Sequence, residues 1–153
     1  MGLIGEVLKS NFAIRIKVRG SSMLPFIRTG DYVTIIPVSL EDARIGDIIA
    51  YGDKERKNII CHRLIKRVNS DLVLKGDTHL WSSEKVSAES LLGKVVSVEC
   101  GKSKFNLEDK PHRFLSCVLA RVSRYFPPLL FLIAYYIEAV RGIRALGQNL
   151  KQV

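Results

Sequence analysis

The stretch FAIRIKVRG, residues 12–20, decides the fold class of this chain. From Phe12 to Val18 every second residue is apolar, and Arg15, Lys17 and Arg19 stand between and after them. A period of two is the side-chain period of a β-strand, so the stretch predicts a strand with one buried and one basic face. Gly20 ends the strand, and the residues after it read as a turn and a short irregular connection.

The same type of pattern continues through the first two thirds of the chain. Short β-branched or apolar runs bounded by turn residues predict further strands. These runs are residues 32–38, 47–51, 58–61, 64–68, 72–75 and 93–99. Asn69-Ser70-Asp71 separates two of them and predicts a hairpin loop.

The periodicity changes after Pro111. Leu115, Val118, Leu119 and Val122 follow helical spacing, and the pair at 127 and 128 is Pro-Pro, which ends this helix and can start the next. We therefore expect a mainly β fold with a C-terminal appendage of two helices. The expected division is a β domain at residues 1–110 and a basic, apolar helical segment at residues 111–153.

Composition narrows the function classes. The 153 residues suit one globular domain, and the formal net charge is +9, with six Lys/Arg against one Asp/Glu in residues 111–153. Three cysteines without a CxxC pair argue against a disulfide framework and a zinc site. A basic segment attracts anionic lipid or nucleic acid. Nothing resembles a nucleic-acid recognition helix, so we expect no nucleic-acid partner.

The longest uncharged apolar run, Tyr125–Ile137, has 13 residues, which is short of the roughly 18–20 that a membrane-spanning helix needs. No secretory signal opens the chain. Two interpretations of the run stay open. Residues 114–144 could lie at a membrane surface as an interfacial segment, or the helices could cover an apolar face of the β domain.

Three short segments carry residues suited to acyl-transfer chemistry. Ser22 lies in Gly20-Ser21-Ser22-Met23-Leu24-Pro25, a Gly/Pro-bounded connection that can expose a hydroxyl. His62 has a side chain that accepts protons near neutral pH. Asp77 follows Lys75-Gly76 at a strand end and could orient an imidazole. Taken singly, each segment could also be an ordinary turn or surface residue.

In this order the segments resemble the signal peptidase I superfamily, which includes self-cleaving LexA-like repressors. The nucleophile box of that superfamily is G-x-S-M-x-P followed by G-D, its base box is H-R-(V/I) in archaeal and endoplasmic-reticulum-type signal peptidases, and its later boxes are K-G-D and G-K-V-V. The matching residues are Gly20, Ser22, Met23, Pro25, Gly30-Asp31, Gly46-Asp47, His62-Arg63-Leu64, Lys75-Gly76-Asp77 and Gly93-Lys94-Val95-Val96.

The resemblance implies a role for each residue. Ser22 would be the nucleophile, His62 the general base and Asp77 the third catalytic member, with Ser21 and Met23 supporting the oxyanion site. No metal or cofactor is implied. Lys66 and Lys75 do not hold the position of the lysine base in other relatives, so we expect solvated side chains there. His79 and His112 are expected to be surface residues.

The expected function is a serine endopeptidase that cleaves signal or leader peptides, associated with the membrane through its C-terminal segment. Most signal peptidases have a spanning helix before the serine, whereas here a strand precedes Ser22, so a cytoplasmic location is the alternative. Two other functions stay open. One is a LexA-like self-cleaving regulator, and the other is an inactive peptidase fold that binds peptides or membranes.

Overall fold

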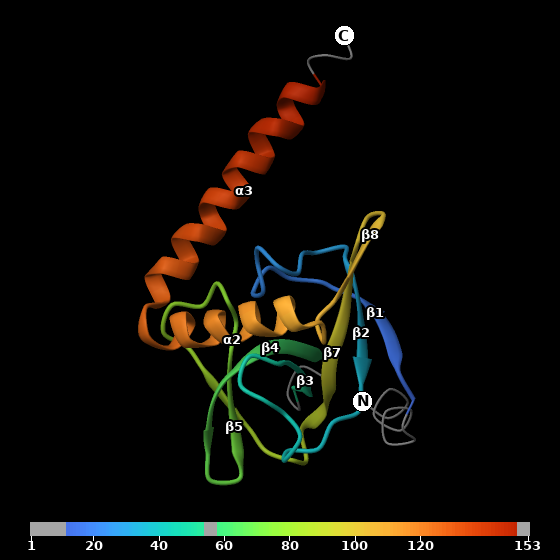
Figure 1. The fold of residues 1–153 in the computed structure, drawn as a ribbon, viewed down its shortest axis with the longest axis vertical. Coiled ribbons are helices and arrows are strands. Elements are labelled where there is room, and N and C mark those ends of the chain that lie inside the picture. Colours follow the sequence, from blue (N-terminus) through green and yellow to red (C-terminus); the bar gives the residue numbers. More distant parts are fainter. Residues whose placement is uncertain (1–11, 54–57, 150–153) are drawn as a thin grey trace.

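The computed structural model describes residues 12–53 and 58–149, and in these residues eight strands and two helices form the fold (Figure 1). The mainly β class with two C-terminal helices is confirmed. The strands are β1 (Ile14–Lys17), β2 (Tyr32–Ile36), β3 (Ile48–Gly52), β4 (Ile59–Val68), β5 (Asp71–Lys75), β6 (Glu84–Val86), β7 (Leu91–Cys100) and β8 (Ser103–Asn106). The helices are α2 (Lys110–Tyr125) and α3 (Pro127–Asn149).

The described strands make one antiparallel sheet in the order β1-β2-β7-β3-β4-β5-β6, with β8 beside β7. β1 stands at one end of this order. Its alternation is as predicted, since Ile14 and Ile16 are half-buried opposite Ile35 and Val33, while Arg15 and Lys17 are exposed.

The structure differs from the predicted strands in two places. The runs at 58–61 and 64–68 belong to one strand, β4, because its first half pairs with β3 and its second half with β5 across an irregularity between Leu64 and Lys66. β6 and β8 were not predicted. β8 is exposed throughout, so it has no alternating burial pattern, and its hydrogen bonds come from its partner β7.

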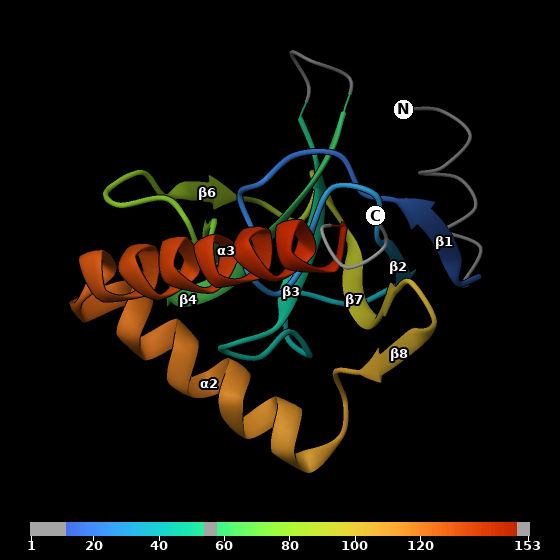
Figure 2. The same cartoon turned by 90° about the horizontal axis from the view of Figure 1, so that it is seen from above.

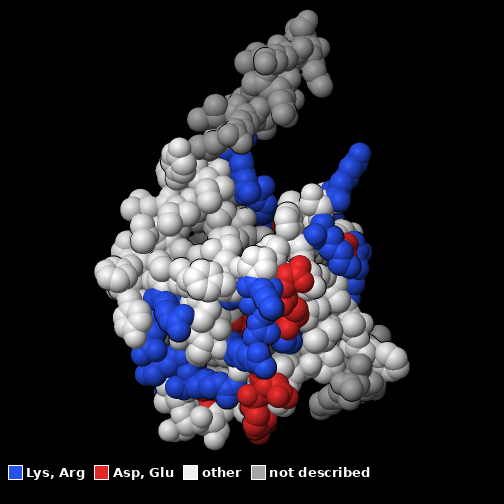
Figure 3. Space-filling model, viewed as in Figure 1, with Lys and Arg blue, Asp and Glu red and all other residues white. Residues whose placement is uncertain are grey.

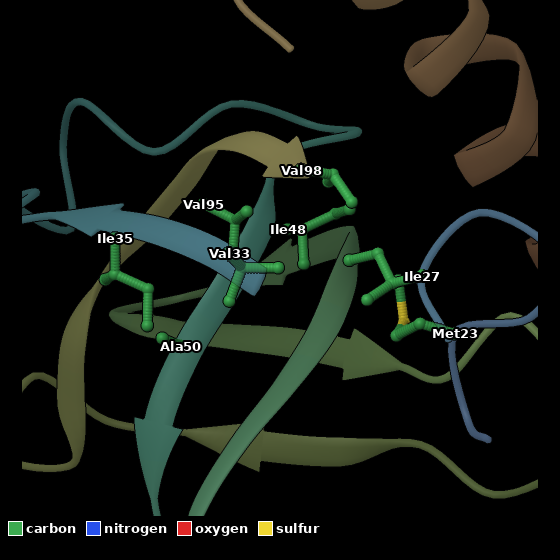
Figure 4. Close-up of a cluster of buried hydrophobic side chains, with 8 residues drawn as sticks. All are labelled: Met23, Ile27, Val33, Ile35, Ile48, Ala50, Val95 and Val98. Atoms are coloured by element: carbon green, nitrogen blue, oxygen red, sulfur yellow. The ribbon is translucent and has the colours of Figure 1, made fainter. Parts of the chain in front are cut away.

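The main core lies between the sheet and the loop that follows β1. Figure 4 shows Val33, Ile35, Ile48, Ala50, Val95 and Val98 projecting from β2, β3 and β7, with Met23 and Ile27 entering from the loop. Met23 is only 4% exposed. Its burial anchors the residue next to Ser22 in the core, which limits the positions that the serine backbone can take.

The two helices relate differently to the sheet. α2 packs against β4, and Gly46 makes room for it, because a Cβ there would lie 2.9 Å from backbone atoms of Ser116 and Cys117. α3 packs against α2 and then runs away from the sheet (Figure 1). Figure 2 shows the two helices diverging from the corner at which they meet. Within the described residues, neither helix combines the length and apolar character needed to cross a bilayer.

Candidate active site

Ser22 lies on a loop that is closed at its base by hydrogen bonds. The Val18 N–H donates to the Asp31 carbonyl at 2.8 Å, and the Gly30 N–H donates to the Val18 carbonyl at 3.0 Å. One step further out, the Thr29 hydroxyl donates to the Gly20 carbonyl at 2.8 Å. The Gly30-Asp31 pair of the nucleophile box therefore acts by fixing the ends of the serine loop.

The loop is also held from the side by the segment after β5. The Ser22 carbonyl accepts from the Thr78 N–H at 3.0 Å and from the Thr78 hydroxyl at 3.2 Å. Gly76 lies directly beneath, because an added Cβ would stand 2.9 Å from the Ser22 carbonyl oxygen and 3.1 Å from both Ser22 Cβ and His79 Nδ1. Only glycine fits this approach without displacing Ser22 or His79, which explains the glycine of the K-G-D box.

His62 is a buried residue of β4, 3% exposed. Its Nδ1 is 3.0 Å from the hydroxyl of Tyr51 on β3, and that hydroxyl donates to Glu84 Oε2 at the start of β6. The Tyr51 hydroxyl has one proton, which this bond commits to Glu84, so its oxygen accepts from His62 Nδ1–H. This tautomer leaves Nε2 of His62 with a free lone pair, as a general base requires.

The surroundings keep the His62 ring neutral. Burial lowers its pKa to about 4 and is the largest influence, while Glu84 opposes the shift and the nearby His79 adds to it. The His62 and His79 rings meet edge to face with centroids 5.2 Å apart. At neutral pH the imidazole is therefore in its proton-accepting form.

The Asp77 carboxylate forms its hydrogen bonds with Arg63 and not with His62 in the part of the chain that the structure describes. The Arg63 side chain, 1% exposed, donates from Nε to Asp77 Oδ1 at 2.8 Å and from Nη2 to Oδ2 at 2.6 Å. Arg63 Nη1 also donates to the Gly46 carbonyl at 3.1 Å. One buried guanidinium thus joins three of the sequence boxes, those at Gly46-Asp47, His62-Arg63 and Gly76-Asp77.

Of the two lysines that were expected to have solvated side chains, one is exposed and one is buried. Lys66 is exposed as expected, but the expectation for Lys75 is wrong. Lys75 is 4% exposed, and its Nζ donates to the carbonyls of Leu80 and Ser123 at 2.9 and 2.8 Å. Packing of α2 on the sheet supplies the Ser123 carbonyl, and burial lowers the pKa of Lys75.

His79 and His112 were expected at the surface, and both are half-buried. His79 lies between the serine loop and His62, so it belongs to the site. His112 stacks edge to face on Phe105, and its buried Nδ1 has no hydrogen-bond partner in the described chain. No pattern of neighbouring residues separates these two environments.

Ser22 and His62 line one cleft of about 690 Å³ together with His79 and Glu84. One wall is β1 and the residues after it, from Ile16 to Gly20, and the other is the stretch from Asn58 to His62. Sequence reasoning missed Tyr51, Glu84 and His79 as members of the site. Tyr51 was inside a predicted strand, but only the pairing of β3 with β4 brings it to His62.

Two further features of the site concern the backbone N–H groups near Ser22 and the side chains that could bind a metal ion. Ser21 is exposed, and within the described residues the N–H groups of Ser22 and Met23 donate to no backbone carbonyl. The described residues hold no cluster of three or more His, Cys, Asp or Glu side chains that could bind a metal ion.

Comparison with known proteins gives the family. A family model described as Peptidase S24-like matches residues 3–96, more than half of the chain. The match covers the serine loop, β4 with His62 and the Gly76-Asp77 turn. No individual curated protein matches the chain significantly. The chain belongs to the Peptidase S24-like family, with the fold of LexA and signal-peptidase-like serine peptidases.

Proposed function

We propose that this protein is a serine endopeptidase in which Ser22 is the nucleophile and His62 the general base. The observation that carries the proposal is the position of His62. It shares a cleft with Ser22, and its Nδ1–H is held by Tyr51 so that Nε2 is the basic atom. Lys75, the buried lysine near the boxes, has its Nζ bonded to two carbonyls and is a poor alternative base.

In the proposed reaction, His62 Nε2 takes the proton of the Ser22 hydroxyl as its oxygen attacks the scissile carbonyl. The imidazolium then protonates the leaving amine, and an acyl-serine ester remains. Water, deprotonated by the same nitrogen, attacks the ester and regenerates Ser22. The backbone N–H groups of Ser22 and Met23 are our candidates for stabilising the oxyanion, with Ser21 beside them.

Two carboxyl groups would support the base in different ways. Glu84 holds the Tyr51 hydroxyl, which fixes the His62 tautomer and stabilises the imidazolium as it forms. Asp77, bound to Arg63, would act as a positioning residue that sets the serine loop against β4. We therefore propose an indirect role for Asp77 in place of direct contact with the imidazole.

The proposed substrate is an extended peptide, such as a signal or leader peptide. β1 lines the cleft and is the end strand among the strands that the structure describes, so a peptide could pair with its backbone while side chains enter the cleft. The apolar lining from Ile16, Val18, Ile27 and Ile59 favours small or apolar substrate side chains. Peripheral association with a membrane through the C-terminal helices would place this cleft near secretory precursors.

The test is a comparison of three variants with the wild-type protein. Ser22→Ala and His62→Ala should each lower turnover of a leader-peptide library by roughly 10⁴-fold. His112→Ala is the matched control, because it removes an imidazole that lies outside the cleft, beside Phe105, and should keep most of the activity. Full activity of Ser22→Ala or His62→Ala would reject the assignment.

A serine-directed acylating probe adds a readout that needs no natural substrate. Wild-type protein should gain the mass of one probe on Ser22, and His62→Ala should react far more slowly. The family match also favours a second candidate, LexA-like self-cleavage. Intact mass after incubation separates the two, since a cut within the chain itself would support self-cleavage.

A further inference from the structure

The corner at which α2 passes into α3 exposes a group of large apolar side chains. Tyr125 and Phe126 are 64% and 67% exposed, and Leu129 and Leu132 follow on the first turns of α3 at 49% and 61%. We call these four residues the corner surface. Exposed apolar groups of this size usually mark an interaction site.

A basic cavity adjoins the corner surface. It has a volume of about 360 Å³, and Tyr125 lines it, so the cavity and the corner surface share a residue. Four cations also line it, Lys66 and Arg67 from β4 and Arg121 and Arg124 from α2. Figure 3 shows patches of Lys and Arg on the face that carries α2.

These four cations have no carboxylate partner among the described residues. Arg67 uses Nη2 to bond carbonyls of the Leu40–Ala43 segment, and Arg121 uses Nη1 to bond the Cys117 sulfur at 2.8 Å. The Arg124 guanidinium lies 5.1 Å from the Tyr125 ring centre. Each arginine therefore keeps further N–H donors, and the cavity holds uncompensated positive charge.

We propose that this cavity binds the phosphate group of an anionic lipid while the corner surface enters the acyl region of the same membrane. A phosphate suits several Arg and Lys donors, and the neighbouring aromatic and leucine side chains suit the interface between headgroups and acyl chains. The proposal does not depend on peptidase activity.

The chemistry disfavours the other occupants of such a surface. A nucleic acid would match the cations but would leave Leu129 and Leu132 in water. A second copy of the chain in a symmetric contact would match the apolar residues but would bring the same cations together, and like charges repel. A membrane with negative headgroups satisfies both halves of the surface.

The experiment is flotation of the full chain with vesicles. The protein should float with phosphatidylcholine vesicles that contain phosphatidylglycerol and remain behind with pure phosphatidylcholine. The double variant Arg121→Gln, Arg124→Gln should bind the anionic vesicles about 30-fold more weakly, given the usual attraction per basic residue. Leu129→Ser with Leu132→Ser should also lose binding, and circular dichroism should show that both variants are folded.

The matched control removes two positive charges elsewhere, as Lys85→Gln with Lys102→Gln, and should bind like the wild type. An equal loss of vesicle binding in this control would show that binding depends only on net charge, and the proposed lipid site would be rejected. Equal binding to neutral vesicles would also overturn it. If inorganic phosphate stabilises the protein but vesicles do not bind, the cavity takes a free anion and the lipid proposal fails. Dimers in sedimentation that Leu129→Ser with Leu132→Ser abolishes would instead assign the surface to a second copy.

Discussion

Replacing Asp77 by asparagine tests whether its carboxylate supports the fold or the chemistry. The change keeps the size of the side chain but removes the charge that two nitrogens of Arg63 contact at 2.8 and 2.6 Å. Arg63 and Asp77 are each about 1% exposed at their side chains, so water cannot replace the lost partner. Removing one member of such a buried pair typically costs about 3–5 kcal/mol, because a desolvated charge remains.

That cost is a large part of the total stability of a domain this size, which is typically about 5–15 kcal/mol. Urea unfolding followed by far-UV circular dichroism should show a lower midpoint with an unchanged slope, and Tm should fall by roughly 10 °C. Asp42→Asn is the matched control, since Asp42 is exposed, and it should change stability by no more than about 0.5 kcal/mol.

A double variant separates the pair from the catalytic role. Arg63→Met with Asp77→Leu removes both charges and should recover much of the lost stability, since an apolar pair of similar volume is often equivalent to a buried ion pair. The structural role for Asp77 is refuted if Asp77→Asn keeps the wild-type urea midpoint but abolishes reaction of Ser22 with an acylating probe. That result would indicate that Asp77 acts on His62 as the third catalytic member.

Three further outcomes follow from the site. Tyr51→Phe should lower kcat roughly tenfold with little change in KM, because His62 Nδ1–H loses the partner that sets its tautomer. Steady-state kinetics would detect this, and an unchanged kcat would exclude Tyr51 and Glu84 from the function of the site. Since burial lowers the pKa of His62 from an ordinary 6.5 to about 4, the unfolded chain binds more protons than the folded chain between these values. Stability should therefore fall as pH drops from 6.5 to 4, and urea midpoints against pH should be flatter in His62→Gln. Gly76→Ala should displace Ser22 by contact with its carbonyl and slow probe labelling, at a stability cost of about 1–3 kcal/mol; wild-type labelling would contradict the close approach.

Much of the fold could be predicted from local pattern. The alternation around Ile14 and Ile16 reflects a strand with one face on the core, and the change of period after Pro111 marks the helices. Both patterns are periodicities among residues that are close in the sequence, so they can be detected without knowing any tertiary contact. β8 was not predicted because all four of its residues are exposed, so its sequence shows no alternation, and it is a strand through its pairing with β7.

For the candidate site, too, one part could be predicted from the sequence and another part depends on the tertiary structure. The order of the Ser22, His62 and Asp77 boxes and their resemblance to a peptidase superfamily were visible in the sequence, and the family match agrees with that resemblance. Which groups contact one another was decided by the sheet. Pairing of β3 with β4 brings Tyr51 to His62, and packing of α2 buries Lys75 against a carbonyl 48 positions away. Hydrogen bonds and desolvation depend on distance in space, and residues far apart in the chain become neighbours only when the sheet and helix assemble.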